Sequence, residues 1–111
     1  MKKIVLLVVF FKIGSFYSQI ISGDIYNTGR KLLTETNFTL KSSKSGVVVF
    51  DVSVDITGKI TSVVVEQSMT SITSTPMRMD AKNLINTFKF EAGNGFPKFH
   101  HGLIKINFIE K

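Results

Sequence analysis

The chain has 111 residues, a formal net charge of +6 and no cysteine, which excludes a disulfide framework, thiolate metal ligands and an N-terminal lipid on cysteine. Three of the positive charges belong to Lys2, Lys3 and Lys12. The other basic residues are scattered, whereas nucleic-acid binding needs a concentrated basic face. We therefore expect no nucleic-acid partner.

Residues 1–18 have the pattern of an export signal. Lys2 and Lys3 precede a run of eight apolar residues, 4–11. A signal peptide needs an apolar stretch of about 7–15 residues, whereas a membrane-spanning helix needs about 20. We interpret residues 1–18 as a signal peptide, which predicts a periplasmic or secreted protein. The alternative is an anchor that is retained, in which case the membrane becomes a partner.

Residues 19–45 form a polar segment rich in Ser, Thr, Asn and Gly. Its candidates for regular structure are a short helix near Arg30–Glu35 and a strand at Phe38–Lys41. Residues 42–46 have the composition of a loop. We expect an irregular N-terminal segment ahead of one small domain, residues 46–111, because the chain is too short to build a second core.

A hairpin is predicted at the start of this domain. Apolar residues alternate along 48–56, which is typical of a half-buried strand, and residues 55–59 form a turn in which Gly58 is free to adopt positive φ. A second strand follows over residues 59–67. Its apolar phase slips by one residue between Ile60 and Val63, so we expect a β-bulge near Thr61–Ser62.

A helix and a last strand complete the predicted domain. Thr75 and Pro76 suit a helix start, and the helical stripe behind them consists of Met77, Ala81, Leu84, Ile85 and Phe88. Glycines 93 and 95 and Pro97 end the helix, and the last strand runs over Leu103–Ile109. The order strand, strand, helix, strand predicts an α+β fold, in which one helix packs on a small antiparallel sheet.

The candidate chemical groups do not assemble into an active site in the sequence. His100 and His101 are neighbours on a strand and point to opposite faces, which disfavours a shared metal. Asp51 and Asp55 are four strand residues apart, about 13 Å, too far for a catalytic carboxylate pair. Ser53 has no base placed to activate it. We predict no enzyme activity, no cofactor and no metal.

The order of these segments resembles the C-terminal domain of TonB-family energy transducers. The likeness lies in the two strands and glycine turn of residues 46–68, the aromatic segment Asn86–Gly93, the turn Gly95–Pro97 and the last strand Ile104–Phe108. The Tyr-Pro box that precedes the first strand in that family is missing. No proline lies in residues 19–45, where the family has a long Pro-rich spacer, so we expect a module that binds but does not pull.

The resemblance implies that the last strand is an edge to which a partner adds an extended segment. The partner-binding residues would then be Leu103, Ile104, Lys105, Ile106, Asn107, Phe108 and Ile109. The expected partner is an envelope protein, with an outer-membrane transport receptor as one candidate. Two alternatives for this strand are a central position in the sheet and self-pairing in a homodimer. The alternative function is a structural or cell-wall-associated envelope domain.

Overall fold

The computed structural model describes residues 20–111. The signal peptide predicted for residues 1–18 lies outside this range. In chain order the elements are β1 (Ile20–Ser22), α2 (Asp24–Thr28), β2 (Thr39–Ser42), β3 (Gly46–Val54), β4 (Ile60–Val65), the 3-10 helix η1 (Gln67–Met69), α3 (Thr75–Asn86) and β5 (His100–Glu110). No helix within residues 20–111 combines the length and the apolarity needed to cross a bilayer.

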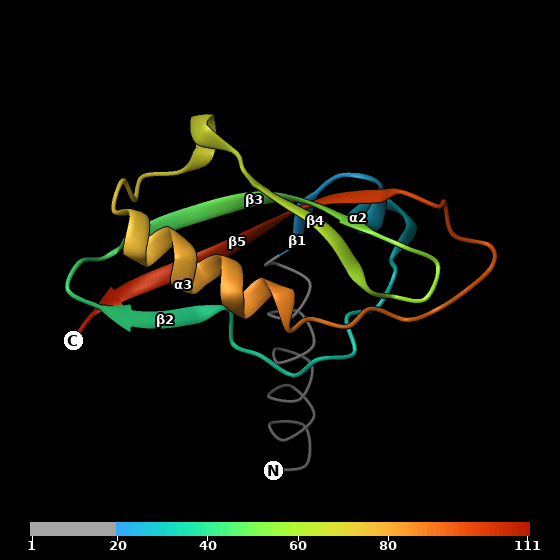
Figure 1. The fold of residues 1–111 in the computed structure, drawn as a ribbon, viewed down its shortest axis with the longest axis horizontal. Coiled ribbons are helices and arrows are strands. Elements are labelled where there is room, and N and C mark those ends of the chain that lie inside the picture. Colours follow the sequence, from blue (N-terminus) through green and yellow to red (C-terminus); the bar gives the residue numbers. More distant parts are fainter. Residues whose placement is uncertain (1–19) are drawn as a thin grey trace, which may run out of the picture.

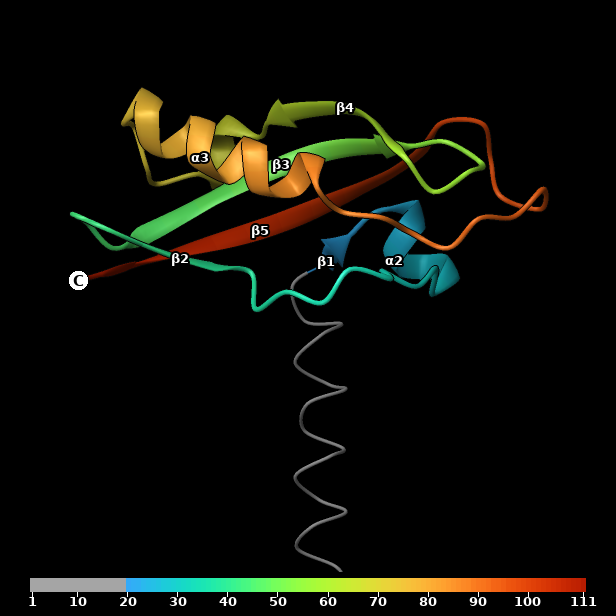
Figure 2. The same cartoon turned by 60° about the horizontal axis from the view of Figure 1, so that its bottom comes forward.

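The strands form one sheet in the order β1-β5-β3-β4, with β2 pairing β5 beyond the end of β1 (Figure 1). The pairings are antiparallel except that of β2 with β5, which is parallel. The α+β fold is confirmed, and residues 46–110 follow the predicted order strand, strand, helix, strand. Figure 2 shows β4 and β2 at opposite margins, with β3 and β5 between them.

The N-terminal segment is more ordered than its composition predicts. It supplies two strands and the short helix α2, which lies at Asp24–Thr28 and not near Arg30–Glu35. The strand expected at Phe38–Lys41 forms one residue later, at Thr39–Ser42. These elements are too short to show a periodic pattern, and β1 and β2 are held by pairing with β5, more than 60 residues away in the chain.

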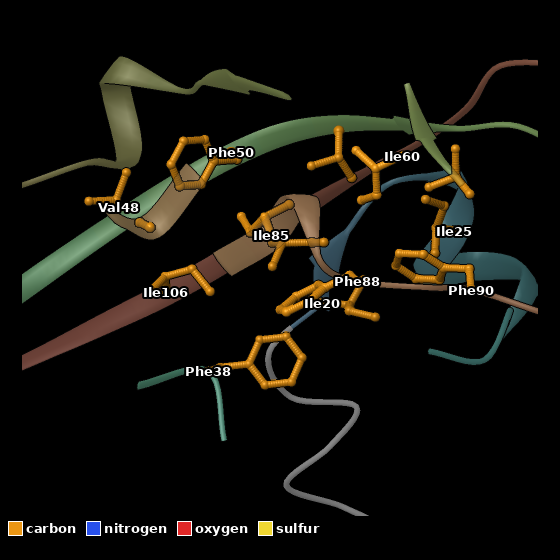
Figure 3. Close-up of a cluster of buried hydrophobic side chains, with 14 of the residues drawn as sticks. Ile20, Ile25, Phe38, Val48, Phe50, Ile60, Ile85, Phe88, Phe90 and Ile106 are labelled. Atoms are coloured by element: carbon orange, nitrogen blue, oxygen red, sulfur yellow. The ribbon is translucent and has the colours of Figure 1, made fainter. Parts of the chain in front are cut away.

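One face of the sheet and α3 enclose the core (Figures 1 and 3). Strands β3 and β5 pair over nine consecutive residues, from Gly46 opposite Phe108 to Val54 opposite His100. Alternate side chains of both strands are buried against the helix, namely Val48, Phe50, Val52, Val54, Ile104, Ile106 and Phe108. Full burial of such a side chain contributes about 1.5–3 kcal/mol, so this double row is the main source of stability.

Helix α3 begins one residue earlier than the sequence suggests. Ser74, not Thr75, is the N-cap, and its hydroxyl accepts the backbone N–H of Met77, while Pro76 lies in the first turn as predicted. Met77, Ala81 and Ile85 are buried. The helix ends at Asn86, before the predicted glycine stop. Phe88 is nevertheless buried, because its ring meets that of Phe38 edge-to-face at 5.4 Å.

The β3–β4 connection contains the predicted turn and bulge. The Asp55 carboxylate accepts the Thr57 hydroxyl and the backbone N–H groups of Lys59 and Thr57. These bonds, the one from the Thr57 hydroxyl above all, lower the pKa of Asp55. The register passes from Ser53 opposite Ser62 to Val54 opposite Ile60. Thr61 is therefore the extra residue of a bulge, as the slip in apolar phase predicts.

Gly58 allows this turn to pack against the chain that follows α3. Its φ is +89°, and a Cβ at this position would lie 1.9 Å from the carbonyl oxygen of Phe90. The same close approach lets the Phe90 N–H donate to the Gly58 carbonyl at 2.9 Å. Only glycine fits both the backbone angle and the space.

Gly58→Ala is expected to lower the free energy of unfolding by more than about 2 kcal/mol, because left-handed strain adds to an overlap with backbone. Urea unfolding measures this. Gly95→Ala is the matched control, since a Cβ there meets nothing within 4 Å and the φ is not positive, and it should change stability by less than about 0.5 kcal/mol. Equal effects of the two substitutions would show that Gly58 is not closely packed.

Candidate functional site

The predicted partner-binding strand, Leu103–Ile109, is not an edge. On one side β5 pairs with β3 along its length. On the other side β1 pairs with Leu103 and Ile104, and β2 pairs with Asn107, Phe108 and Ile109. The prediction of an open edge at residues 103–109 is therefore wrong, and its alternative, a central strand, is what the structure has.

The backbone of β5 leaves little room for an added strand. Asn107 donates its N–H to the Phe38 carbonyl at 2.9 Å, so its backbone groups face the β2 side. Backbone groups alternate in direction along a strand, so Lys105 also faces that side, at the gap between β1 and β2. Among the residues of 103–109 that face this side, Lys105 alone lacks a partner from the described parts of β1 and β2, and a single residue cannot hold an added strand in register.

The side chains of Leu103–Ile109 belong mostly to the body of the domain. Ile104, Ile106 and Phe108 are buried under α3. Leu103, Lys105 and Asn107 are half-buried on the opposite face, and Ile109 is 44% exposed. This strand is consequently a structural support, and a candidate binding site must lie elsewhere on the sheet.

The longest open edge within the described residues is β4. It ends the strand order and pairs only with β3. It has six residues, against three in β1 and four in β2. An edge strand presents unpaired N–H and C=O groups to which another chain can add. We therefore take the outer side of β4 as the candidate site.

Hydrogen bonds at the end of the hairpin identify the free backbone groups. Val49 donates its N–H to the Thr70 hydroxyl at 3.0 Å and accepts the Glu66 N–H at 2.8 Å, so its backbone groups point toward β4. Asp51 and Ser53, two and four residues on, point the same way. Their partners Val64 and Ser62 therefore bond to β3, whereas the N–H and C=O groups of Val63 and Val65 point outward.

The side chains of β4 do little to protect this edge. The sequence Ile60–Val65 contains no charged residue and no proline, the usual devices against edge-to-edge pairing. The bulge at Thr61 disturbs only the start of the strand. Val63 and Val65 are half-buried and pack against the core, while the Val64 side chain is 58% exposed on the other face. The last three residues therefore offer a regular, apolar template.

Arg30 is a buried residue that sequence analysis missed. It is 2% exposed and joins four segments. Its Nε donates to the Glu91 carbonyl at 2.9 Å and its Nη2 to the Asp55 carbonyl at 2.7 Å. Its Nη1 lies 3.1 Å from His100 Nδ1, and the guanidinium stacks on the Phe96 ring at 4.0 Å. It thereby holds together the N-terminal segment, the β3–β4 turn, the chain between α3 and β5, and the start of β5.

This arrangement requires a neutral His100. An arginine can only donate, so Nδ1 must accept, and the proton must sit on Nε2, which lies 3.4 Å from the Thr28 hydroxyl. Burial and the charge of Arg30 lower the pKa of His100 below its ordinary 6.5, with a smaller contribution from His101, while Asp24 opposes the shift. Burial also lowers the pKa of Arg30, against the raising effect of Glu91 and Asp55.

The remaining chemical candidates do not form a catalytic group in the described residues. His100 is the buried first residue of β5, and His101 points to the opposite face as predicted, 3.4 Å from the Asp51 carboxylate. Ser53 is cross-strand from His101, but its hydroxyl is buried and makes no hydrogen bond to it. Asp55 is a turn residue. No three His, Cys, Asp or Glu side chains in residues 20–111 gather as metal ligands.

Stability should fall as pH drops below about 6.5. The unfolded chain binds a proton at His100 near this pH, while the folded protein resists it, so acid favours unfolding until the lowered folded-state pKa is passed. Thermal melts between pH 8 and 5 measure the effect. His100→Gln should flatten the profile, because it removes the buried imidazole. An unchanged profile in His100→Gln would contradict a neutral buried histidine.

Comparisons with family models, with curated proteins and with solved structures gave no match. The likeness to TonB-family C-terminal domains therefore remains a prediction from the sequence. The structure adds an uncharged edge strand, β4, which pairs with β3 on one side only.

Proposed function

We propose that this protein is an exported, non-enzymatic binding module that takes up an extended segment of an envelope protein by strand addition at the outer edge of β4. The observation that carries the proposal is the outward direction of the backbone groups of Val63 and Val65 on a strand without charge or proline. The signal-like residues 1–18 and the resemblance to TonB-family domains support the location and the kind of partner.

The edge is held in a fixed shape before any partner arrives. Five residue pairs join β4 to β3, and β3 is joined to β5 by nine. The Arg30 cluster fixes the turn at the start of β4 through the Asp55 carbonyl, and Gly58 packs that turn on Phe90. A preorganised edge spends little of the binding free energy on its own ordering.

Backbone pairing alone would give weak capture. Val63 and Val65 together offer two donors and two acceptors, and a net hydrogen bond contributes about 0.5–1.5 kcal/mol. Four such bonds give about 2–6 kcal/mol before the cost of association, and about 4 kcal/mol corresponds to a Kd of about 1 mM. A useful affinity therefore requires side chains of the partner to contact the surroundings of β4.

Val63→Pro should abolish strand addition and leave the domain folded. Proline removes an outward N–H and is tolerated on an edge strand. The probe is a soluble eight-residue peptide of alternating Glu and Thr, and amide exchange of the full chain is measured with and without it. Binding should slow exchange at Val63 and Val65. Val63→Thr, which keeps the donor, is the control and should retain the protection.

Far-UV circular dichroism of both variants checks that the fold is kept. Protection that appears only on another strand, or peptide affinity that is equal in Val63→Pro and the natural protein, would overturn the proposal. Protection of Val63 and Val65 without peptide, rising with protein concentration, would instead identify a second copy of the chain as the occupant.

A further inference from the structure

The flank of α3 beside β4 carries basic side chains. Arg78 shows which side of α3 lies toward β4. Its Nη2 donates to the Gln67 side chain at 3.1 Å and its Nε to the Ile72 carbonyl at 2.7 Å, and both of these residues follow the end of β4 in the chain. Lys82 lies one helical turn further on, hence on the same flank, and is exposed. Asp80, the acidic residue of the helix, lies on the opposite flank of α3, as its helical position requires.

Two further lysines lie at the start of β4. Lys59 and Lys89 form an isolated antiparallel bridge, so two like charges sit side by side there, both exposed. Lys59 precedes the core-facing Ile60, and Lys89 lies between the buried Phe88 and Phe90, so strand alternation turns both side chains away from the α3 face. The basic side chains on the α3 side of β4, here called the basic row, are therefore Arg78 and Lys82. In residues 20–111 no side-chain carboxylate lies within 4.0 Å of a lysine or arginine nitrogen. The ion pair in this part of the chain is between His101 and Asp51.

Three carboxylates at the two ends of the β3–β4 hairpin and in the chain after α3 are already hydrogen-bonded. Glu66 accepts the Ser68 N–H and hydroxyl at the far end of β4. Asp55 accepts from Thr57 and Lys59 within its turn. Glu91 accepts the Lys31 N–H at 2.9 Å. These hydrogen bonds hold the carboxylates in place without cancelling their charge. Within residues 20–111 no carboxylate forms an ion pair with Arg78 or Lys82, and alternation from the core-facing Val65 puts Glu66 on the Val64 face.

Strand geometry sorts the side chains of such an added strand. Val63 and Val65 point to the α3 face, since they lie opposite Val52 and Phe50 of the core face, and Val64 points away. In an added strand about 4.8 Å away, residues opposite Val63 and Val65 would also point to the α3 face, next to the basic row. Residues opposite Val64 would lie beside its exposed side chain on the other face.

We infer that the segment captured at β4 alternates acidic with β-branched residues, its Asp or Glu side chains facing the basic row and its Val, Ile or Thr side chains facing Val64. This inference rests on the proposed function and names the partner class of the same edge. Charge complementarity selects an acidic peptide, and the alternation distinguishes it from a general polyanion.

The test compares four eight-residue probes on the full chain at low salt: alternating Glu and Thr, alternating Gln and Thr, alternating Lys and Thr, and a block peptide of four Glu followed by four Thr. The alternating acidic peptide should bind about tenfold tighter than the neutral one, as expected for two exposed ion pairs, and this preference should fade as salt rises. The basic peptide and the block peptide should both bind more weakly than the alternating acidic peptide and the neutral peptide.

Charge reversal at the row provides the second arm. Lys82→Glu should cut the acidic preference by about half or more, while Lys41→Glu, the same change on exposed β2 across the sheet, should leave it intact. Equal binding of acidic and neutral peptides, with Val63 and Val65 protected, would overturn the inference and leave strand addition standing. Equal affinity for the block peptide and the alternating acidic peptide would show that binding depends on net charge alone, and it would also overturn the inference. Binding of no peptide would defeat the proposed function itself.

Discussion

The rest of the structure depends on the pairing of β5 on both of its sides. A buried strand must satisfy its N–H and C=O groups, and here β3 serves one side while β1 and β2, from the polar N-terminal segment, serve the other. This pairing turns the last strand into the middle of the sheet. As a result, the longest open edge in the described residues is β4, on the other side of β3 from β5.

The position of β4 beside α3 gives this edge its chemical character. The helix crosses the core face, so its β4 flank borders the space beyond the sheet, and Arg78 and Lys82 lie there. The face away from the helix presents Val64, the exposed Asp51 cross-strand from it, and the small polar residues of β4. The two faces of the sheet beside β4 therefore carry different side chains. Although β4 itself has no charged residue, these neighbouring side chains can select among extended segments.

Alternation and helical spacing predicted β3, β4, α3 and β5, because these elements are long enough for their buried faces to show as a period. The bulge at Thr61 was predictable for the same reason. The strand β1 was not predicted, since three residues held by a distant partner leave no local pattern. The strand β2 was predicted one residue early, but its parallel pairing with β5 was not, because no local pattern contains it. Arg30 was missed because its burial depends on carbonyls and a histidine supplied by residues 55, 91 and 100. The edge was misplaced because neither β1 nor the pairing of β2 with β5 was predicted.

Amide hydrogen exchange of the full chain without any partner tests the central claim most directly. The account predicts slow exchange at Ile104, Ile106 and Asn107 of β5, and an alternation along β4 in which Val64 is protected while Val63 and Val65 exchange quickly. Fast exchange throughout β5, or protection of Val63 and Val65 equal to that of Val64 in a monomer, would contradict an interior β5 and an open β4.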